Sequence, residues 1–155
     1  MATTKTPTKR SASTGTVWSD EEKAAMKEGA RERKSSAKLT PAEERAAGER
    51  DLLDKVAGLP EPDRSMATRI HELVTAAAPA LAPKTYYGMP AYAKDGKTVC
   101  FFKPKSKFKE RYATFGFEQG AGLDDGTMWP TSFALTELTP ATEARIVDLV
   151  KKAIA

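Results

Sequence analysis

The sequence predicts an α+β fold, in which an antiparallel β-sheet is flanked by helices and an extra helical extension precedes it. Two observations predict this class. Apolar residues recur with the helical period of about 3.6 residues in the first half of the chain and near its end, whereas residues 83–138 alternate as strands do. In addition, Asp95–Gly96 is a typical two-residue hairpin turn, which makes the strands on either side antiparallel neighbours.

The composition allows one compact domain and excludes several classes of protein. The 155 residues are 40% hydrophobic and 30% charged, as in ordinary soluble proteins. A lone cysteine, Cys100, excludes an internal disulfide and a multi-thiolate metal site. No apolar run approaches the roughly 20 residues of a membrane helix, and no hydrophobic stretch follows the basic N-terminus as in a secretory signal. We therefore expect a cytoplasmic protein without membrane contact.

The first 58 residues are predicted to lie outside the main domain. Residues 1–17 contain one residue worth burying, Val17, and are predicted to be a disordered tail. Capping boxes at Ser19–Glu22 and Thr40–Glu43 predict the starts of two helices that end near residues 36 and 57. The predicted division is a tail over 1–17, a helical extension over 18–58 and an α+β domain over 59–155.

The domain is predicted to begin and end with helices that cover its sheet. Asp63 is predicted to cap a helix that Pro79 ends, and Thr139 precedes the last helix. Strands are predicted over 85–87, 91–93, 97–102, 111–117 and 131–138. The hairpin turn would place Tyr92 opposite Val99, and apolar side chains on both faces predict that this hairpin lies inside the sheet.

A tyrosine-rich bend is the sharpest candidate site. Gly88 permits a bend and Pro90 is expected to interrupt strand pairing, so the aromatic rings on either side offer flat apolar walls with polar tips. The structural alternative is a core strand that turns a corner of the sheet. The candidate pocket residues are Tyr86, Tyr87, Gly88, Met89, Pro90, Tyr92 and Trp129.

Basic residues gather in the following segment, where Phe101, Phe102, Phe108 and Tyr112 are interleaved with them. Lysines beside aromatic rings can hold phosphates and stack bases, and the alternative is a solvated surface that serves solubility. The candidate anion-binding residues are Lys94, Lys97, Lys103, Lys105 and Arg111, and Lys107 and Lys109 belong to the same basic segment.

Carboxylates occur in two pairs that are candidates for a hard cation such as iron, Glu61 with Asp63 and Asp124 with Asp125. Helix capping and turn formation are the structural alternatives for these residues. His71, the only histidine, is predicted on the border of a buried helix stripe, and Cys100 is predicted to be buried and inert. Because no nucleophile motif or phosphate-binding glycine loop occurs, we expect a protein that is not an enzyme.

Two stretches, Tyr-Gly-Met-Pro-Ala-Tyr at 87–92 and Arg-Tyr-Ala-Thr-Phe-Gly-Phe at 111–117, resemble the YdhG-like family. This family of small bacterial domains, long catalogued as of unknown function, includes members described as frataxin-like iron chaperones. The resemblance covers residues 59–155 and implies a central antiparallel sheet flanked by helices. It also implies a cytoplasmic protein that delivers iron to iron–sulfur or haem assembly proteins, and it assigns no individual iron ligand.

Two functional hypotheses follow from these features. The first is a non-enzymatic YdhG-like domain that handles intracellular iron through its surface carboxylates. The second is a binding module that takes an anionic small molecule or a nucleic acid through the tyrosine-lined bend and the lysine-rich hairpin. A plainer possibility is an interaction domain whose N-terminal helices dock a partner.

Overall fold

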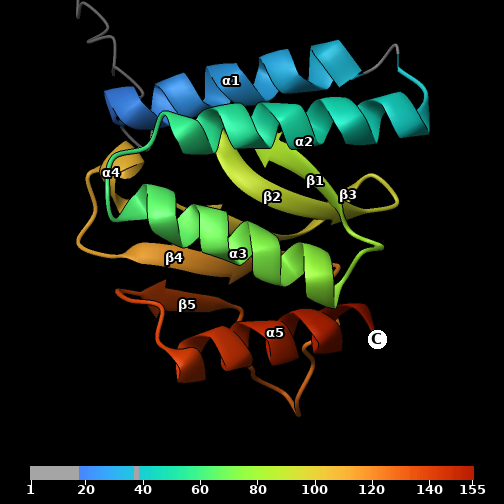
Figure 1. Ribbon diagram of the computed structural model, residues 1–155, viewed down its shortest axis with the longest axis vertical. Coiled ribbons are helices and arrows are strands. Elements are labelled where there is room, and N and C mark those ends of the chain that lie inside the picture. Colours follow the sequence, from blue (N-terminus) through green and yellow to red (C-terminus); the bar gives the residue numbers. More distant parts are fainter. Residues whose placement is uncertain (1–17, 37–38) are drawn as a thin grey trace, which may run out of the picture.

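The computed structural model describes residues 18–36 and 39–155 and confirms the α+β class. The predicted tail over 1–17 lies outside these residues. Within the described residues, five helices and five strands follow one another in the order that the sequence pattern predicts, apart from one short added helix, α4 (Figure 1). They are α1 (Asp20–Ser36), α2 (Pro41–Ala57), α3 (Asp63–Ala77), β1 (Ala82–Tyr86), β2 (Met89–Lys94), β3 (Lys97–Lys103), α4 (Lys105–Phe108), β4 (Ala113–Phe117), β5 (Ser132–Leu135) and α5 (Pro140–Ile154).

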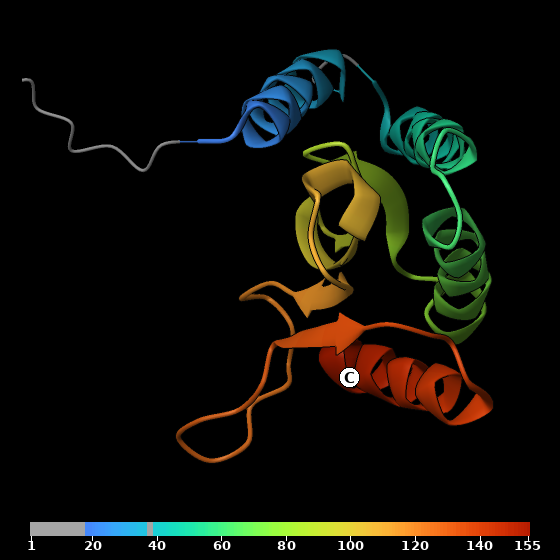
Figure 2. The same cartoon turned by 90° about the vertical axis from the view of Figure 1, so that its left-hand side faces the viewer.

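The sheet is an antiparallel meander in which each strand pairs with the next along the chain, in the order β1-β2-β3-β4-β5. The hairpin of β2 and β3 therefore lies inside the sheet, as predicted. Strands β4 and β5 are shorter than the predicted 111–117 and 131–138. The segment between them runs out as a long loop (Figure 2). Among the described helices, none has the length and the apolar character that crossing a membrane requires.

The predicted register of the central hairpin is correct at the turn and wrong beyond it. Lys94 faces Lys97 and Ala93 faces Thr98, as the Asp95–Gly96 turn predicts. A β-bulge then shifts the register, so Tyr92 faces Cys100 and not Val99. A bulge inserts one unpaired residue into one strand, which moves every later pair by one position. Tyr92 and Cys100 consequently share one face of the sheet, which is the face that the helices cover.

The tyrosine-rich bend is a second hairpin turn, which corrects the predicted break at Pro90. Tyr87 and Gly88 have φ of 51° and 75°, the left-handed pair that a two-residue turn of the primed type requires. Strand pairing resumes directly, with Tyr86 opposite Met89 and Thr85 opposite Pro90. The β2–β3 register begins only at Ala91. Pro90 is therefore tolerated because it lies at the end of that ladder.

The hydrophobic core lies between the sheet and α2, α3 and α5, which Figures 1 and 2 show along one side and one edge of the strands. Helix α2 contributes Leu52 and Val56 to the same core as the predicted 59–155 domain. It also approaches β1 so closely that a Cβ atom on Gly48 would collide with the Pro83 carbonyl oxygen. The other large buried side chains of the core include Ile70, Val74, Tyr92, Phe102, Phe115 and Val150.

Helix α1 lies outside this core, above the β1–β2 turn. Only Ala25 and Gly29 are buried among its described side chains, whereas Met26 and the preceding Trp18 are exposed. Both predicted capping boxes are present: the Ser19 hydroxyl accepts a hydrogen bond from the Glu22 amide, and the Thr40 hydroxyl accepts one from the Glu43 amide. Capping and charge contacts therefore hold α1 more than apolar burial does.

Candidate functional site

The predicted tyrosine pocket is divided between two faces of the sheet. Tyr92 is completely buried in the core, where its hydroxyl lies 3.0 Å from Nδ1 of His71. The other ring nitrogen, Nε2, lies 3.2 Å from Oε1 of Glu49. Burial raises the pKa of Tyr92 far above its usual range. Tyr92 is therefore a core residue that links β2 through His71 to α2.

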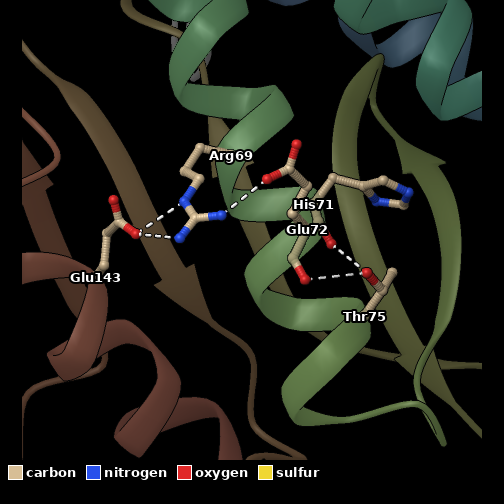
Figure 3. Close-up of polar contacts among 5 residues, drawn as sticks. All are labelled: Arg69, His71, Glu72, Thr75 and Glu143. Atoms are coloured by element: carbon tan, nitrogen blue, oxygen red, sulfur yellow. Dashed lines mark hydrogen bonds and ion pairs between the residues drawn. The ribbon is translucent and has the colours of Figure 1, made fainter. Parts of the chain in front are cut away.

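Figure 3 shows how α3 presents its polar side chains around His71. The His71 ring points toward the strands, while Arg69 points the other way, toward α5. Arg69 forms ion pairs with Glu72 at 2.8 Å and with Glu143 of α5 at 2.7 Å, and Thr75 donates to the His71 carbonyl at 2.7 Å. The predicted place of His71 at the border of the buried stripe is thus correct, and its contacts are structural.

Tyr86 and Tyr87 line a cavity of about 280 Å³ between α1, α2 and β1. Their rings meet edge to face with centroids 4.6 Å apart. The centroid of the Phe101 ring lies 6.2 Å from that of Tyr86. Burial, together with the nearby Glu118 carboxylate, raises the pKa of Tyr86. The rest of the wall is mixed in charge, with three carboxylates and two cationic side chains: Glu32, Glu44, Asp51, Arg33 and Lys84.

The other pocket candidates do not line this cavity. Met89 and Pro90 are buried in the sheet beyond the turn. Trp129 is half-buried and packs against the main core from the loop between β4 and β5. Gly88 contributes its backbone amide to the β1–β2 turn.

The Tyr87–Gly88 turn directs two backbone amides at one carboxylate. The Tyr87 amide lies 3.2 Å from Oε2 of Glu32, and the Gly88 amide lies 3.1 Å from Oε1 of the same side chain. Successive amides in a left-handed turn form a concave site with partial positive charge, which binds anions. In the structure that anion is a side chain of α1.

A second carboxylate of α1 lies beside the first, against the same turn. Oε1 of Glu28 lies 3.1 Å from Nζ of Lys107, and its Oε2 lies 3.0 Å from Nζ of Lys55. A Cβ atom on Gly88 would collide with this carboxylate, so glycine is required there for contact as well as for its positive φ. Burial of Glu28 alone would raise its pKa, but hydrogen bonds from Lys55 and Lys107 outweigh it and the pKa is lowered.

We call this arrangement the Tyr87–Gly88 anion site, made of the two turn amides and the ammonium groups of Lys55 and Lys107. One further pair extends it along α1: Nζ of Lys109 lies 2.6 Å from Oε1 of Glu21. That hydrogen bond lowers the pKa of Glu21. Three carboxylates of α1 thus meet cationic or amide groups of the domain.

The five predicted anion-binding residues are not gathered in one place. Lys94 and Lys97 flank the Asp95–Gly96 turn, whereas Lys103 lies six residues further along β3, roughly 20 Å away at 3.3 Å per residue. Lys103 pairs with Glu110 at 2.5 Å, and Arg111 stacks on Tyr112. Lys105 follows at the start of α4.

Sequence reasoning placed Lys107 in the basic segment but missed Lys55 and the carboxylates of α1. The heptad-like spacing of Glu21 and Glu28, with Glu32 one turn further, is the signal that could have indicated a common helix face. Nothing in the sequence shows that this face meets the β1–β2 turn.

Of the four candidate metal-binding carboxylates, Glu61 and Asp63 contact different protein groups. Glu61 pairs with Arg64 at 3.0 Å and accepts from the Ser65 amide, and contacts with Ser65 lower its pKa. Asp63 is buried, but it does not cap α3 as predicted. Its Oδ2 accepts from the amide and the hydroxyl of Ser106, and its Oδ1 has no hydrogen-bond partner among the described residues.

Asp124 and Asp125 are exposed in the loop between β4 and β5. Within residues 18–36 and 39–155, no three histidine, cysteine or acidic side chains form a group that could hold a metal ion. Residues 1–17 and 37–38 contain none of these residue types. The four predicted carboxylates therefore belong to no group of that size, and a metal role for them stays a prediction.

In comparisons with known proteins, no family model, no curated protein and no solved structure matches the chain.

Proposed function

We propose that the protein is a non-enzymatic binding module that takes the anionic group of a ligand at the Tyr87–Gly88 anion site. The observation that carries this proposal is the pair of turn amides that converge on one carboxylate at 3.2 and 3.1 Å. Hydrogen bonds to an ionised acceptor are roughly twice as strong as neutral ones, and two lysines add charge at the same place.

The cavity beside the turn supports a ligand that also has a flat apolar part. The rings of Tyr86 and Tyr87 form one wall of it, and a cavity of about 280 Å³ approaches the size of ordinary small-molecule sites. Aromatic walls next to a few placed polar groups are the usual arrangement for binding such a ligand.

The placement of reactive groups supports a role other than catalysis. Cys100 is fully buried, and burial raises the pKa of its thiol to about 12, so it stays protonated. Both ring nitrogens of His71 are engaged, one by a buried tyrosine. Neither side chain belongs to the anion site.

Iron handling, with delivery to iron–sulfur or haem assembly proteins, stays a prediction of the resemblance to the YdhG-like family. Calorimetric titration with ferrous iron tests it. Because the four candidate carboxylates do not assemble, we expect no binding tighter than about 100 μM, which corresponds to roughly −5.5 kcal/mol. Tighter saturable binding at one equivalent would restore the iron hypothesis over the anion-binding one.

The proposal is tested with phenyl phosphate, a flat ring that carries an anionic group. The full chain with Glu32→Gln is titrated while the amide resonances of Tyr87 and Gly88 are followed by NMR, because this variant removes the carboxylate that the two turn amides bind. We expect saturable shifts of both resonances with phenyl phosphate and none with phenol.

Two matched variants locate the site within the same titration. Adding Lys107→Ala should weaken binding about tenfold or more, because charge-assisted hydrogen bonds contribute about 1.5–3 kcal/mol. Adding Lys151→Ala, which removes the same charge from the exposed end of α5, should leave the affinity unchanged. Equal shifts with phenyl phosphate and phenol, or equal losses in the two lysine variants, would overturn the proposal.

A further inference from the structure

The surface beneath α1 matches a helix that presents three carboxylates in one stripe. Glu21, Glu28 and Glu32 are separated by seven and four residues, which brings them to the same side of an α-helix. Each one meets a positive group of the domain: Lys109, then Lys107 with Lys55, then the two turn amides.

Small residues between these carboxylates allow the helix to approach closely. Ala25 and Gly29 are buried among the residues of α1 whose burial the structure describes, and a Cβ atom on Gly29 would lie 2.7 Å from the Tyr87 ring. The surface therefore complements a helix backbone with a small-residue stripe, in addition to the negative charges beside it. Helix α1 contacts β1 and α4, and Figure 1 shows its N-terminal end above α4.

Helix α1 is weakly held by comparison with the helices of the core. Two of its ion pairs use exposed lysines, Lys55 and Lys109 at 46% and 77% side-chain exposure, and ion pairs of exposed side chains contribute little to stability. It adds little buried apolar surface to the packing of the protein. An isolated polar helix of 17 residues is only marginally stable in water. Local detachment of α1 therefore costs far less than global unfolding.

We infer that this surface is a docking site for an acidic helix of a partner protein, and that α1 occupies it as an internal competitor. The inference rests on the proposed anion-binding function, and it names the ligand that fits the whole surface. The carboxylates of the partner helix follow the spacing of Glu21, Glu28 and Glu32, which spans 11 residues or about 16 Å at 1.5 Å per residue. A partner helix with the same spacing of carboxylates and small residues can displace α1, because α1 buries few apolar side chains of its own.

A peptide with the sequence of residues 18–36 and blocked ends is the probe. Its binding to the full chain is measured by fluorescence anisotropy, for the unaltered protein and for the double variant Glu28→Gln/Glu32→Gln. The double variant loses the charges that hold its own α1, so we expect it to bind the peptide about tenfold or more tightly than the unaltered protein.

Three controls accompany this measurement. Glu22→Gln removes one charge from α1 but keeps an acceptor for its capping box, and this variant should behave as the unaltered protein. A peptide with glutamine at positions 28 and 32 and a scrambled peptide of the same composition should both fail to bind the double variant.

The outcomes separate this inference from the function on which it rests. If phenyl phosphate shifts the turn amides but the peptide binds no variant, the docking inference is wrong and the anion site stands. If the scrambled peptide binds equally, or if the unaltered protein has twice the mass of one chain by light scattering without peptide, the inference is also wrong. In the second case, α1 of another copy would be the occupant.

Discussion

At the scale of single residues, Tyr92 shows how one polar atom is accommodated in the core. Its ring packs among apolar side chains, and its hydroxyl meets Nδ1 of His71, which is itself joined to Glu49. A buried hydroxyl without a partner would cost about 1–3 kcal/mol. The chain of contacts from Glu49 to Tyr92 therefore makes a tyrosine acceptable at this position.

Replacing Tyr92 with phenylalanine should lower the free energy of unfolding by about 1–2 kcal/mol, because His71 Nδ1 loses its partner inside the protein. Urea denaturation followed by tryptophan fluorescence measures this change, with an unaltered m-value. Tyr112→Phe is the control, since that tyrosine is half-buried and stacks on Arg111, and it should change the free energy by less than about 0.5 kcal/mol. Equal effects of the two substitutions would contradict the role given to the Tyr92 hydroxyl.

At the scale of elements, α1 differs from α2, α3 and α5 in what holds it. The three core helices bury apolar side chains against the sheet, whereas α1 is held mainly by Glu21, Glu28 and Glu32. Carboxylate contacts depend on pH and on salt in a way that apolar burial does not. Helix α1 should therefore respond to conditions that leave the core intact.

Acid should release α1 before it unfolds the domain. The pKa values of Glu21 and Glu28 are lowered from the ordinary 4.5 by their lysine partners, so their contribution is complete above that pH. It is lost as the pH falls through the lowered values, because the protonated groups no longer attract the lysines. We expect the Tyr87 and Gly88 amide resonances to move below pH 4.5 while the Cys100 amide stays in place. Simultaneous movement of all three would indicate one cooperative unit.

At the scale of the whole molecule, one continuous core includes α2 and the domain that follows it. Leu52 and Val56 of α2 belong to the same cluster as Phe102, Phe115 and Val150. The predicted boundary between residues 58 and 59 thus falls between two helices of one core. Because Cys100 is completely buried inside this cluster, its thiol reports on opening of the whole fold.

The thiol of Cys100 should react with a disulfide reagent at pH 8 only through opening of the core. Burial raises its pKa to about 12, so both access and thiolate formation are suppressed in the folded protein. We expect labelling at least about a thousandfold slower than in the urea-unfolded chain. Glu28→Gln, which loosens α1 alone, should leave the labelling rate unchanged, and a rate close to that of the unfolded chain would contradict the burial of Cys100.

Local patterns were sufficient to predict much of the fold. The Asp95–Gly96 turn, both capping boxes and the last helix follow from residues within a few positions of one another, and the structure contains all of them. Cys100 is buried as predicted because its strand lies between two others in the sheet. These features depend on short-range sterics and hydrogen bonds, which a sequence displays directly.

The errors arose where one residue takes a conformation that its neighbours do not require. The bulge between β2 and β3 changes the partner of Tyr92, and the left-handed Tyr87 turns an expected strand end into a hairpin. The Asp63 carboxylate accepts a hydrogen bond from the Ser106 amide of α4 and does not cap the start of its own helix, α3. A contact between positions 63 and 106 leaves no local trace in the sequence.

By itself, the sequence determined that helices precede and follow a set of antiparallel strands, because periodicity and turn chemistry are properties of neighbouring residues. Only the tertiary structure decided that Tyr86 and Tyr87 line a cavity while Tyr92 fills the core. It also decided that the acidic face of α1 meets the turn amides and Lys107. The second outcome depends on the docking of segments more than 50 residues apart, for which charge complementarity and close packing act only once the chain has folded.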